Sequence, residues 1–87
     1  MKKEKEDERI GRLFAILGTL SPHSQVTVRD LAEEYEVSPR TIQRDLKALM
    51  NAELGIFYDN EKIKISRLGY RKIKSWMIGW FRQNFPL

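Results

Sequence analysis

The sequence has no cysteine and a single histidine among its 87 residues. Without thiols the chain can form neither disulfide bonds nor cysteine-ligated metal sites, which fits a reducing compartment. The one histidine, His23, has no second histidine near it and falls in an expected turn, so a metal site there has little support. We therefore expect no metal ion and no cofactor.

Long hydrophobic runs are also missing. No segment approaches the roughly 20 apolar residues of a membrane-spanning helix, and the first residues, MKKEKEDER, contain no apolar run typical of a signal peptide. A catalytic nucleophile would need a base beside it, and His23 in a turn does not supply one. We therefore expect a non-enzymatic, cytoplasmic protein that has no membrane partner.

The charge of the chain is unevenly distributed. Residues 1–36 contain six lysines and arginines against eight acidic residues, a net charge of −2, whereas residues 37–87 contain ten against four, a net charge of +6. A basic half attracts an anionic partner. Nucleic acid is favoured over a membrane surface, because no helix combines its basic face with a wholly apolar one.

The segment 38–50 has the pattern of a capped, amphipathic helix. Ser38 is a favourable N-cap, and Pro39 suits the first helical position, where its missing N–H costs nothing. One face is apolar, with Ile42, Leu46, Leu49 and Met50 at helical spacing. The opposite face carries Arg40, Gln43, Arg44, Lys47 and Asn51. Such cationic and amide side chains suit base edges and phosphates, so the segment is predicted to be a recognition helix in the major groove of DNA.

A first helix is expected before residue 20, after a charged and solvated lead-in over residues 1–8. Its buried stripe is predicted from the helical spacing of Ile10, Leu13, Phe14, Leu17 and Leu20. Gly18 and the pair Ser21-Pro22 mark the end of this helix.

A second helix is predicted from about Val28 to Tyr35. Thr27 with Asp30 three residues later reads as a capping box for it. Residues 26–28 could also form a very short strand against a later hairpin, and both interpretations hold if Val26 is extended while Thr27 caps. The brief connection to the recognition helix makes these two helices a helix-turn-helix.

Residues 56–65 alternate with the period of a half-buried β-hairpin. The inner positions are Ile56, Tyr58, Ile63 and Ile65, and the outer ones are Phe57, Lys62 and Lys64. A turn at Asn60-Glu61 would place Tyr58 opposite Ile63, and Gly55 is available for a left-handed or turn conformation. A small hairpin here is a wing. Lys62 and Lys64 are expected to point outward near phosphate, although protection of an edge strand explains them nearly as well.

The last predicted element is an aromatic helix within residues 67–87, which we separate from a DNA-binding domain over residues 1–66. Its apolar stripe consists of Tyr70, Ile73, Trp76, Met77, Trp80 and Phe81. The stripe could pack on the first helix as core. Its size for so short a chain favours a dimer contact.

The run VTVRDLAEEYEVSPRTIQRDLKAL, residues 26–49, resembles the winged helix-turn-helix of DeoR-type repressors and of the N-terminal domain of WYL-domain regulators. The matching positions are Thr27, Leu31, Ala32, Val37, Ser38, Thr41, Ile42, Arg44, Asp45, Leu46 and Leu49. The resemblance implies a bacterial transcription regulator in which Ser38, Thr41 and Arg44 touch DNA. Those families continue into an effector-sensing domain, whereas only the aromatic helix follows here, so we expect no small-molecule effector in this chain.

The predicted fold is mainly α with a small β-hairpin: a winged helix-turn-helix with a three-helix core, a wing and an extra C-terminal amphipathic helix. The predicted function is sequence-specific binding of double-stranded DNA by a homodimeric transcription regulator. The expected DNA contacts are Arg29, Ser38, Arg40, Thr41, Gln43, Arg44, Lys47, Lys62 and Lys64. A winged-helix protein–protein adaptor and an oligomerisation module without DNA binding are the alternatives.

Overall fold

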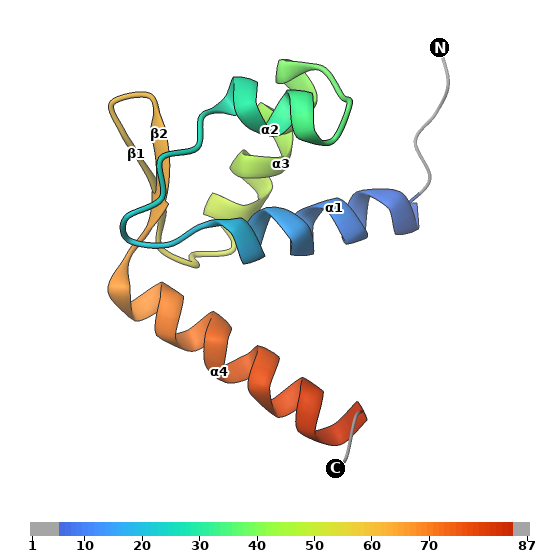
Figure 1. Ribbon diagram of the computed structural model, residues 1–87, viewed down its shortest axis with the longest axis vertical. Coiled ribbons are helices and arrows are strands. Elements are labelled where there is room, and N and C mark those ends of the chain that lie inside the picture. Colours follow the sequence, from blue (N-terminus) through green and yellow to red (C-terminus); the bar gives the residue numbers. More distant parts are fainter. Residues whose placement is uncertain (1–5, 85–87) are drawn as a thin grey trace.

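The computed structural model describes residues 6–84, apart from the side chains of residues 80, 81 and 84. Its elements in chain order are α1 (Glu6–Thr19), α2 (Val28–Glu34), α3 (Pro39–Asn51), β1 (Ile56–Asp59), β2 (Lys62–Ile65) and α4 (Arg67–Asn84) (Figure 1). This order confirms the predicted fold class. Of the charged lead-in, residues 6–8 form the first turn of α1, and residues 1–5 lie outside the described residues.

The helix-turn-helix is formed by α2 and α3, and its caps were predicted correctly. The Thr27 hydroxyl accepts from the Asp30 N–H, and the Asp30 carboxylate accepts from the Thr27 N–H, so the capping box is complete. Ser38 caps α3 by accepting from the Thr41 N–H at 3.2 Å. The turn between the helices passes through Glu36, whose φ of 53° is left-handed.

The wing has the predicted register, with Ile56 opposite Ile65 and Tyr58 opposite Ile63. Asn60 in its turn has a φ of 58°, which asparagine tolerates better than most residues. The segment 21–26 lies along the other edge of β2. The Ile63 N–H donates to the Val26 carbonyl at 2.8 Å, and the Ser24 hydroxyl donates to the Ile63 carbonyl at 2.7 Å. The predicted Thr27 cap is therefore confirmed and the Val26 carbonyl bonds to the hairpin, although residues 26–28 are not assigned as a strand.

One prediction about the wing was wrong. Tyr58 was expected on the buried side, yet it is 46% exposed, whereas Ile63 opposite it is fully buried. The difference follows from the position of the strands. β2 is flanked by β1 and by segment 21–26, but β1 is an edge strand, and Tyr58 near its tip lies beyond the surface that the helices cover.

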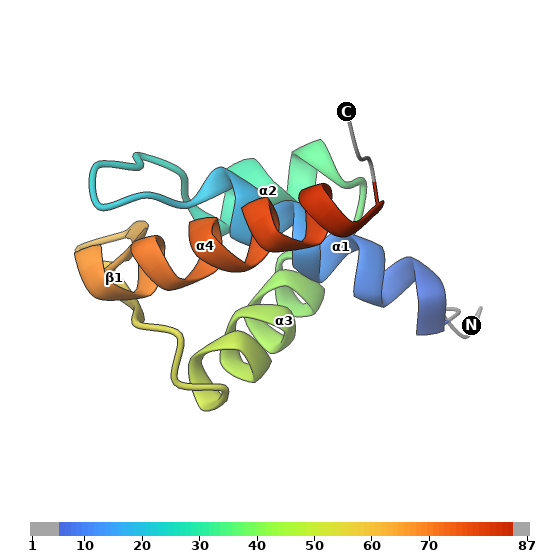
Figure 2. The same ribbon diagram turned by 90° about the horizontal axis from the view of Figure 1, so that it is seen from below.

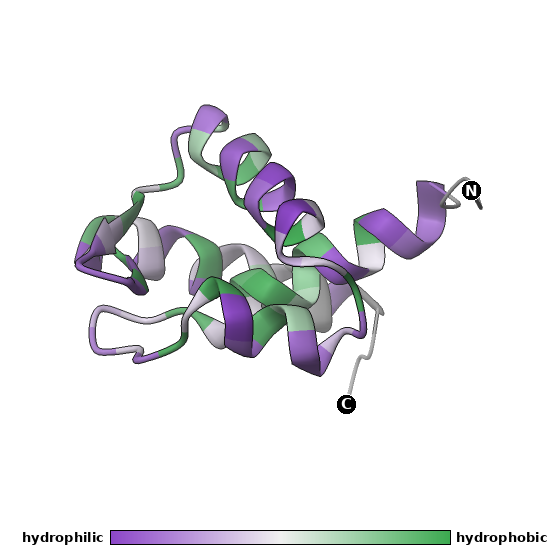
Figure 3. Ribbon diagram, turned by 90° about the horizontal axis from the view of Figure 1, so that it is seen from above, coloured by the Kyte–Doolittle hydropathy of each residue, from purple (hydrophilic) through white to green (hydrophobic). Residues whose placement is uncertain are grey.

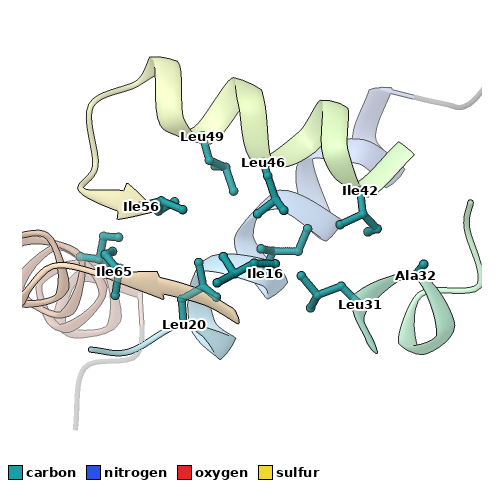
Figure 4. Packing of buried hydrophobic residues seen from close by; sticks show 11 residues of the cluster. Ile16, Leu20, Leu31, Ala32, Ile42, Leu46, Leu49, Ile56 and Ile65 are labelled. Atoms are coloured by element: carbon teal, nitrogen blue, oxygen red, sulfur yellow. The ribbon is translucent and has the colours of Figure 1, made fainter. Parts of the chain in front are cut away.

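The core lies between α1, the helix-turn-helix and the base of the wing. Figure 4 shows side chains of α3 pointing toward Ile16 of α1 and Leu20 just after it, with contributions from α2 and the hairpin. Its buried members are Ile16, Leu20, Leu31, Ala32, Ile42, Leu46, Leu49, Ile56, Ile63, Ile65 and Ile73.

The predicted buried stripe of α1 was partly wrong. Ile10 and Phe14 are 48% and 63% exposed, whereas Leu20 is buried as predicted and Leu13 and Leu17 pack partly against the core. The buried residues within α1 itself are Arg12 and Ile16. The helix is rotated so that Arg12 faces α3, because Asp45 of α3 is there to receive its guanidinium. The two opposite charges are buried together as an ion pair.

Two glycines allow the backbone between α3 and α4 to turn and to pack closely. Gly55 has a φ of 85°, as its predicted left-handed conformation requires, and it lies where the chain turns from α3 into β1. Gly69 is in the first turn of α4, where an added Cβ would lie 2.0 Å from the Leu54 carbonyl oxygen. Only glycine allows α4 to start this close to the preceding backbone.

The expected aromatic stripe of α4 is divided in the structure. Ile73 is buried in the core of its own chain, and Tyr70 and Met77 pack partly against that core. Trp76 is 59% exposed, and the side chains of Trp80 and Phe81 lie outside the described residues. Ile73 therefore cannot belong to an exposed dimer surface as predicted. Figure 1 shows α4 leaving the wing and running diagonally below α1, and the view from below in Figure 2 has α4 in front of α1.

Candidate nucleic-acid interface

The outer face of α3 carries the predicted DNA-contacting side chains. Arg40, Gln43, Arg44 and Lys47 are all exposed, while Ile42, Leu46 and Leu49 on the opposite face are buried. Figure 3 shows a mainly hydrophilic outer surface on α3, with hydrophobic positions beside the core. The structure thus brings four of the predicted residues together on one projecting helix.

The first turn of α3 adds two hydroxyl groups to this surface. The side chains of Ser38 and Thr41 lie 3.1 Å apart, oxygen to oxygen, and Ser38 is exposed while Thr41 is half-buried. Hydroxyls at a helix N-terminus are suited to phosphate oxygens, because the free N–H groups and the helix dipole favour negative charge there. Guanidinium and amide groups further along the helix have the geometry to bond guanine and adenine edges.

A buried ion pair joins the recognition helix to α1. Arg12 donates from Nε to Asp45 Oδ2 and from Nη2 to Asp45 Oδ1, the second bond at 3.2 Å, and Arg9 Nε lies 3.4 Å from Oδ1. The side chains of Arg12 and Asp45 are 7% and 1% exposed. A bidentate guanidinium contact fixes orientation as well as distance. The contact with Asp45 therefore fixes how α3 is turned about its own axis relative to α1. In this orientation Arg44, the residue before Asp45, faces outward.

Sequence reasoning missed this pair, although the sequence contains a signal for it. Asp45 falls at helical spacing from Ile42 and Leu49 on the apolar face of α3, and Arg12 is four residues before Ile16 on α1. Opposite charges on two apolar faces that pack together predict a buried salt bridge.

The wing offers less positive charge than the sequence suggested. Lys62 and Lys64 are half-buried, and the Lys64 ammonium lies 3.4 Å from an Asp59 carboxylate oxygen. The tip itself carries exposed Asp59 and Glu61. Lys64 would have to leave Asp59 to meet a phosphate.

The remaining predicted contact, Arg29, lies on α2. Its Nε is 3.5 Å from Glu33 one turn later, and both side chains are well exposed. Exposed pairs of this kind contribute little to stability, so the Arg29 guanidinium can exchange Glu33 for a phosphate.

Within residues 6–84, no three His, Cys, Asp or Glu side chains are grouped so as to hold a metal ion. Among the described helices, none has the length and apolar character needed to cross a membrane.

Two helices in a helix-turn-helix, followed by a hairpin, define a winged helix-turn-helix domain, a class in which the second helix enters the major groove. The family described as "HTH domain" matches residues 12–71, and the chain belongs to that helix-turn-helix family. Membership in this family makes DNA its partner. No curated protein and no solved structure matches the chain.

Proposed function

We propose that the chain is a sequence-specific transcription regulator that binds double-stranded DNA through α3. The observation that carries this proposal is the exposed face of Arg40, Gln43, Arg44 and Lys47, opposite a buried apolar stripe on the second helix of the motif. Arg44 and Gln43 read base edges, while Arg40, Lys47 and the hydroxyls of Ser38 and Thr41 bind phosphates. Arg29, Lys62 and Lys64 add phosphate contacts beside the groove.

The relationship to DeoR-type repressors and WYL-domain regulators is part of the proposal. It is supported by the T-I-x-R-D-L run from Thr41 to Leu46. In this structure Ile42, Asp45 and Leu46 of that run are buried. Arg44 is the exposed member, and we assign the specific base contact to it.

The proposed regulator acts as a homodimer in which α4 contributes to the contact. Two copies present two recognition helices to half-sites about one DNA turn apart. The dimerisation set is narrower than the aromatic stripe, because Ile73 and Met77 face the core of their own chain.

The test begins with duplexes selected from a random DNA pool, followed by fluorescence anisotropy with the best of them. Arg44→Ala is expected to weaken binding by about 1–3 kcal/mol and to relax preference at one base pair. Lys72→Ala removes one exposed cation from α4 outside its groove; it is the matched control and keeps that preference.

The proposal fails if Arg44→Ala and Lys47→Ala both leave DNA affinity unchanged while circular dichroism shows an intact fold. Salt dependence separates the adaptor alternative. Binding to DNA weakens steeply with added salt through counterion release, and an apolar protein contact does not.

A further inference from the structure

Helix α1 exposes acidic and apolar side chains on one face. Glu6, Ile10 and Phe14 follow one another at i, i+4 and i+8, so they lie along the same side of the helix. Asp7 extends the acidic end of this face, and Glu6 and Asp7 are both exposed. Phe14 is 63% exposed, although α1 has a separate buried line through Ile16. A helix face that only contacts solvent has no need of two large apolar side chains one turn apart, so the exposed Ile10 and Phe14 indicate a contact surface.

Helix α4 carries a matching series on its outer face. Lys74, Ile78 and Arg82 have the same i, i+4 and i+8 spacing. They line an open groove together with Tyr70, Arg71, Ser75 and Gly79. The Lys74 ammonium lies 5.3 Å from the centre of the Tyr70 ring, which places one cation over an aromatic face at the edge of this groove.

We propose that these two faces bind each other between two copies of the chain, with α1 of each copy in the α4 groove of the other. In either helix direction Ile10 meets Ile78, Glu6 meets one cation of the Lys74/Arg82 pair, and Phe14 meets the other. The three contacts are an ion pair, an apolar contact and a cation–π contact. This inference rests on the homodimer of the proposed function and not on DNA binding.

The contact has to form between copies, because the chain cannot make it with itself. Ile73 on the opposite side of α4 packs into the chain's own core, so the groove face points away from that chain's α1. In Figure 2 the ribbon of α4 lies in front of α1. Each copy has both an acidic-apolar face and a basic-apolar face, so a two-fold pairing makes the contact twice and closes the assembly.

Charge reversal followed by sedimentation velocity without DNA tests the pairing. One variant carries Glu6→Lys with Asp7→Lys, and a second carries Lys74→Glu with Arg82→Glu. Each alone places like charges together at both contacts, which should raise the dimer dissociation constant roughly tenfold or more. A mixture of the two should form heterodimers, and a chain with all four changes should dimerise again.

A control variant with Glu34→Lys and Glu61→Lys changes exposed acidic residues elsewhere by the same charge and should keep the parent's dimer. Phe14→Ser tests the apolar half of the contact and should also favour the monomer. Circular dichroism verifies that each variant is folded.

A parent that sediments as a monomer at micromolar concentration overturns the proposal, and so does an assembly larger than a dimer. Separate reversals that leave the dimer intact also overturn it. If the Lys74→Glu, Arg82→Glu variant loses DNA affinity but not its dimer, the groove is a phosphate surface instead. A parent that dimerises but does not bind selected duplex refutes the proposed function alone.

Discussion

Helices α3 and α4 are both amphipathic and both carry a basic face, but the rest of the molecule covers them to different extents. The inner side chains of α3 meet α1, α2 and the hairpin, and Ile42 and Leu46 are fully buried. On α4, Ile73 is buried while Trp76 and Ile78 are more than half exposed. An apolar stripe at helical spacing thus predicts a helix face that packs against other protein surface. Whether one chain can cover it depends on how many neighbours surround the helix.

The largest effect is expected at Asp45, which fixes α3 to α1. Asp45→Ala should lower the free energy of unfolding by about 3–5 kcal/mol, because it removes the carboxylate from a buried ion pair. Urea denaturation measures the change. Replacing both partners, with Arg12→Met and Asp45→Leu, should be close to neutral. A single Asp45→Ala variant as stable as the parent would show that the pair does not hold α3.

The inner faces of the two helices can be compared directly by truncation. Ile42→Ala and Ile73→Ala should each cost about 2–5 kcal/mol, with the larger loss at Ile42, whose surroundings are closed on every side. Trp76→Ala should change stability by less than about 0.5 kcal/mol, since its side chain is mostly in solvent. Thermal unfolding in dilute protein provides the measurement. Equal losses at Ile73 and Trp76 would mean that α4 is covered as evenly as α3.

The N-cap residues of α3 and α4 allow the first turns of the two helices to be compared. Ser38 and Ser66 each accept a hydrogen bond from a backbone N–H three residues later. Each serine-to-alanine change should cost about 1 kcal/mol in urea denaturation. Only Ser38→Ala should also weaken DNA binding, because the proposed DNA surface includes the N-terminus of α3 and not that of α4. Loss of DNA affinity in Ser66→Ala would place α4 in the DNA interface as well.

The smallest effect concerns the wing beside α3. Lys62→Ala should flatten the slope of log affinity against log salt by about one phosphate contact. Lys64→Ala should change it less, because Lys64 is paired with Asp59 and only 15% exposed. Asp59→Ala should release Lys64 and steepen the slope. Identical slopes in all three variants would remove the wing from the DNA contacts.

Local signals predicted most of the fold. The capping box at Thr27, the Ser38-Pro39 start of α3 and the alternation around Asn60 each act within a few residues, so the sequence alone contains them. The four exposed side chains of the α3 surface were predicted for the same reason.

The errors arose where burial depends on a neighbour in space. Arg12 is buried because Asp45 faces it, and Tyr58 is exposed because no element covers the tip of β1. Met77 and Trp76 are adjacent in the apolar stripe of α4, yet only Met77 reaches the core. No local pattern distinguishes these cases, since each depends on how distant segments pack.

The bonds between β2 and segment 21–26 determine when the wing can form during folding. Ser24 and Ile63, which they join, are 39 residues apart in sequence, and an isolated two-stranded hairpin is only marginally stable. The base of the wing therefore becomes ordered only after α1 and the helix-turn-helix have brought these segments together. In the native state the Ile63 amide should exchange with solvent only through near-complete unfolding. The wing contacts proposed for DNA would therefore start from a base that is already rigid, with little conformational entropy lost there on binding.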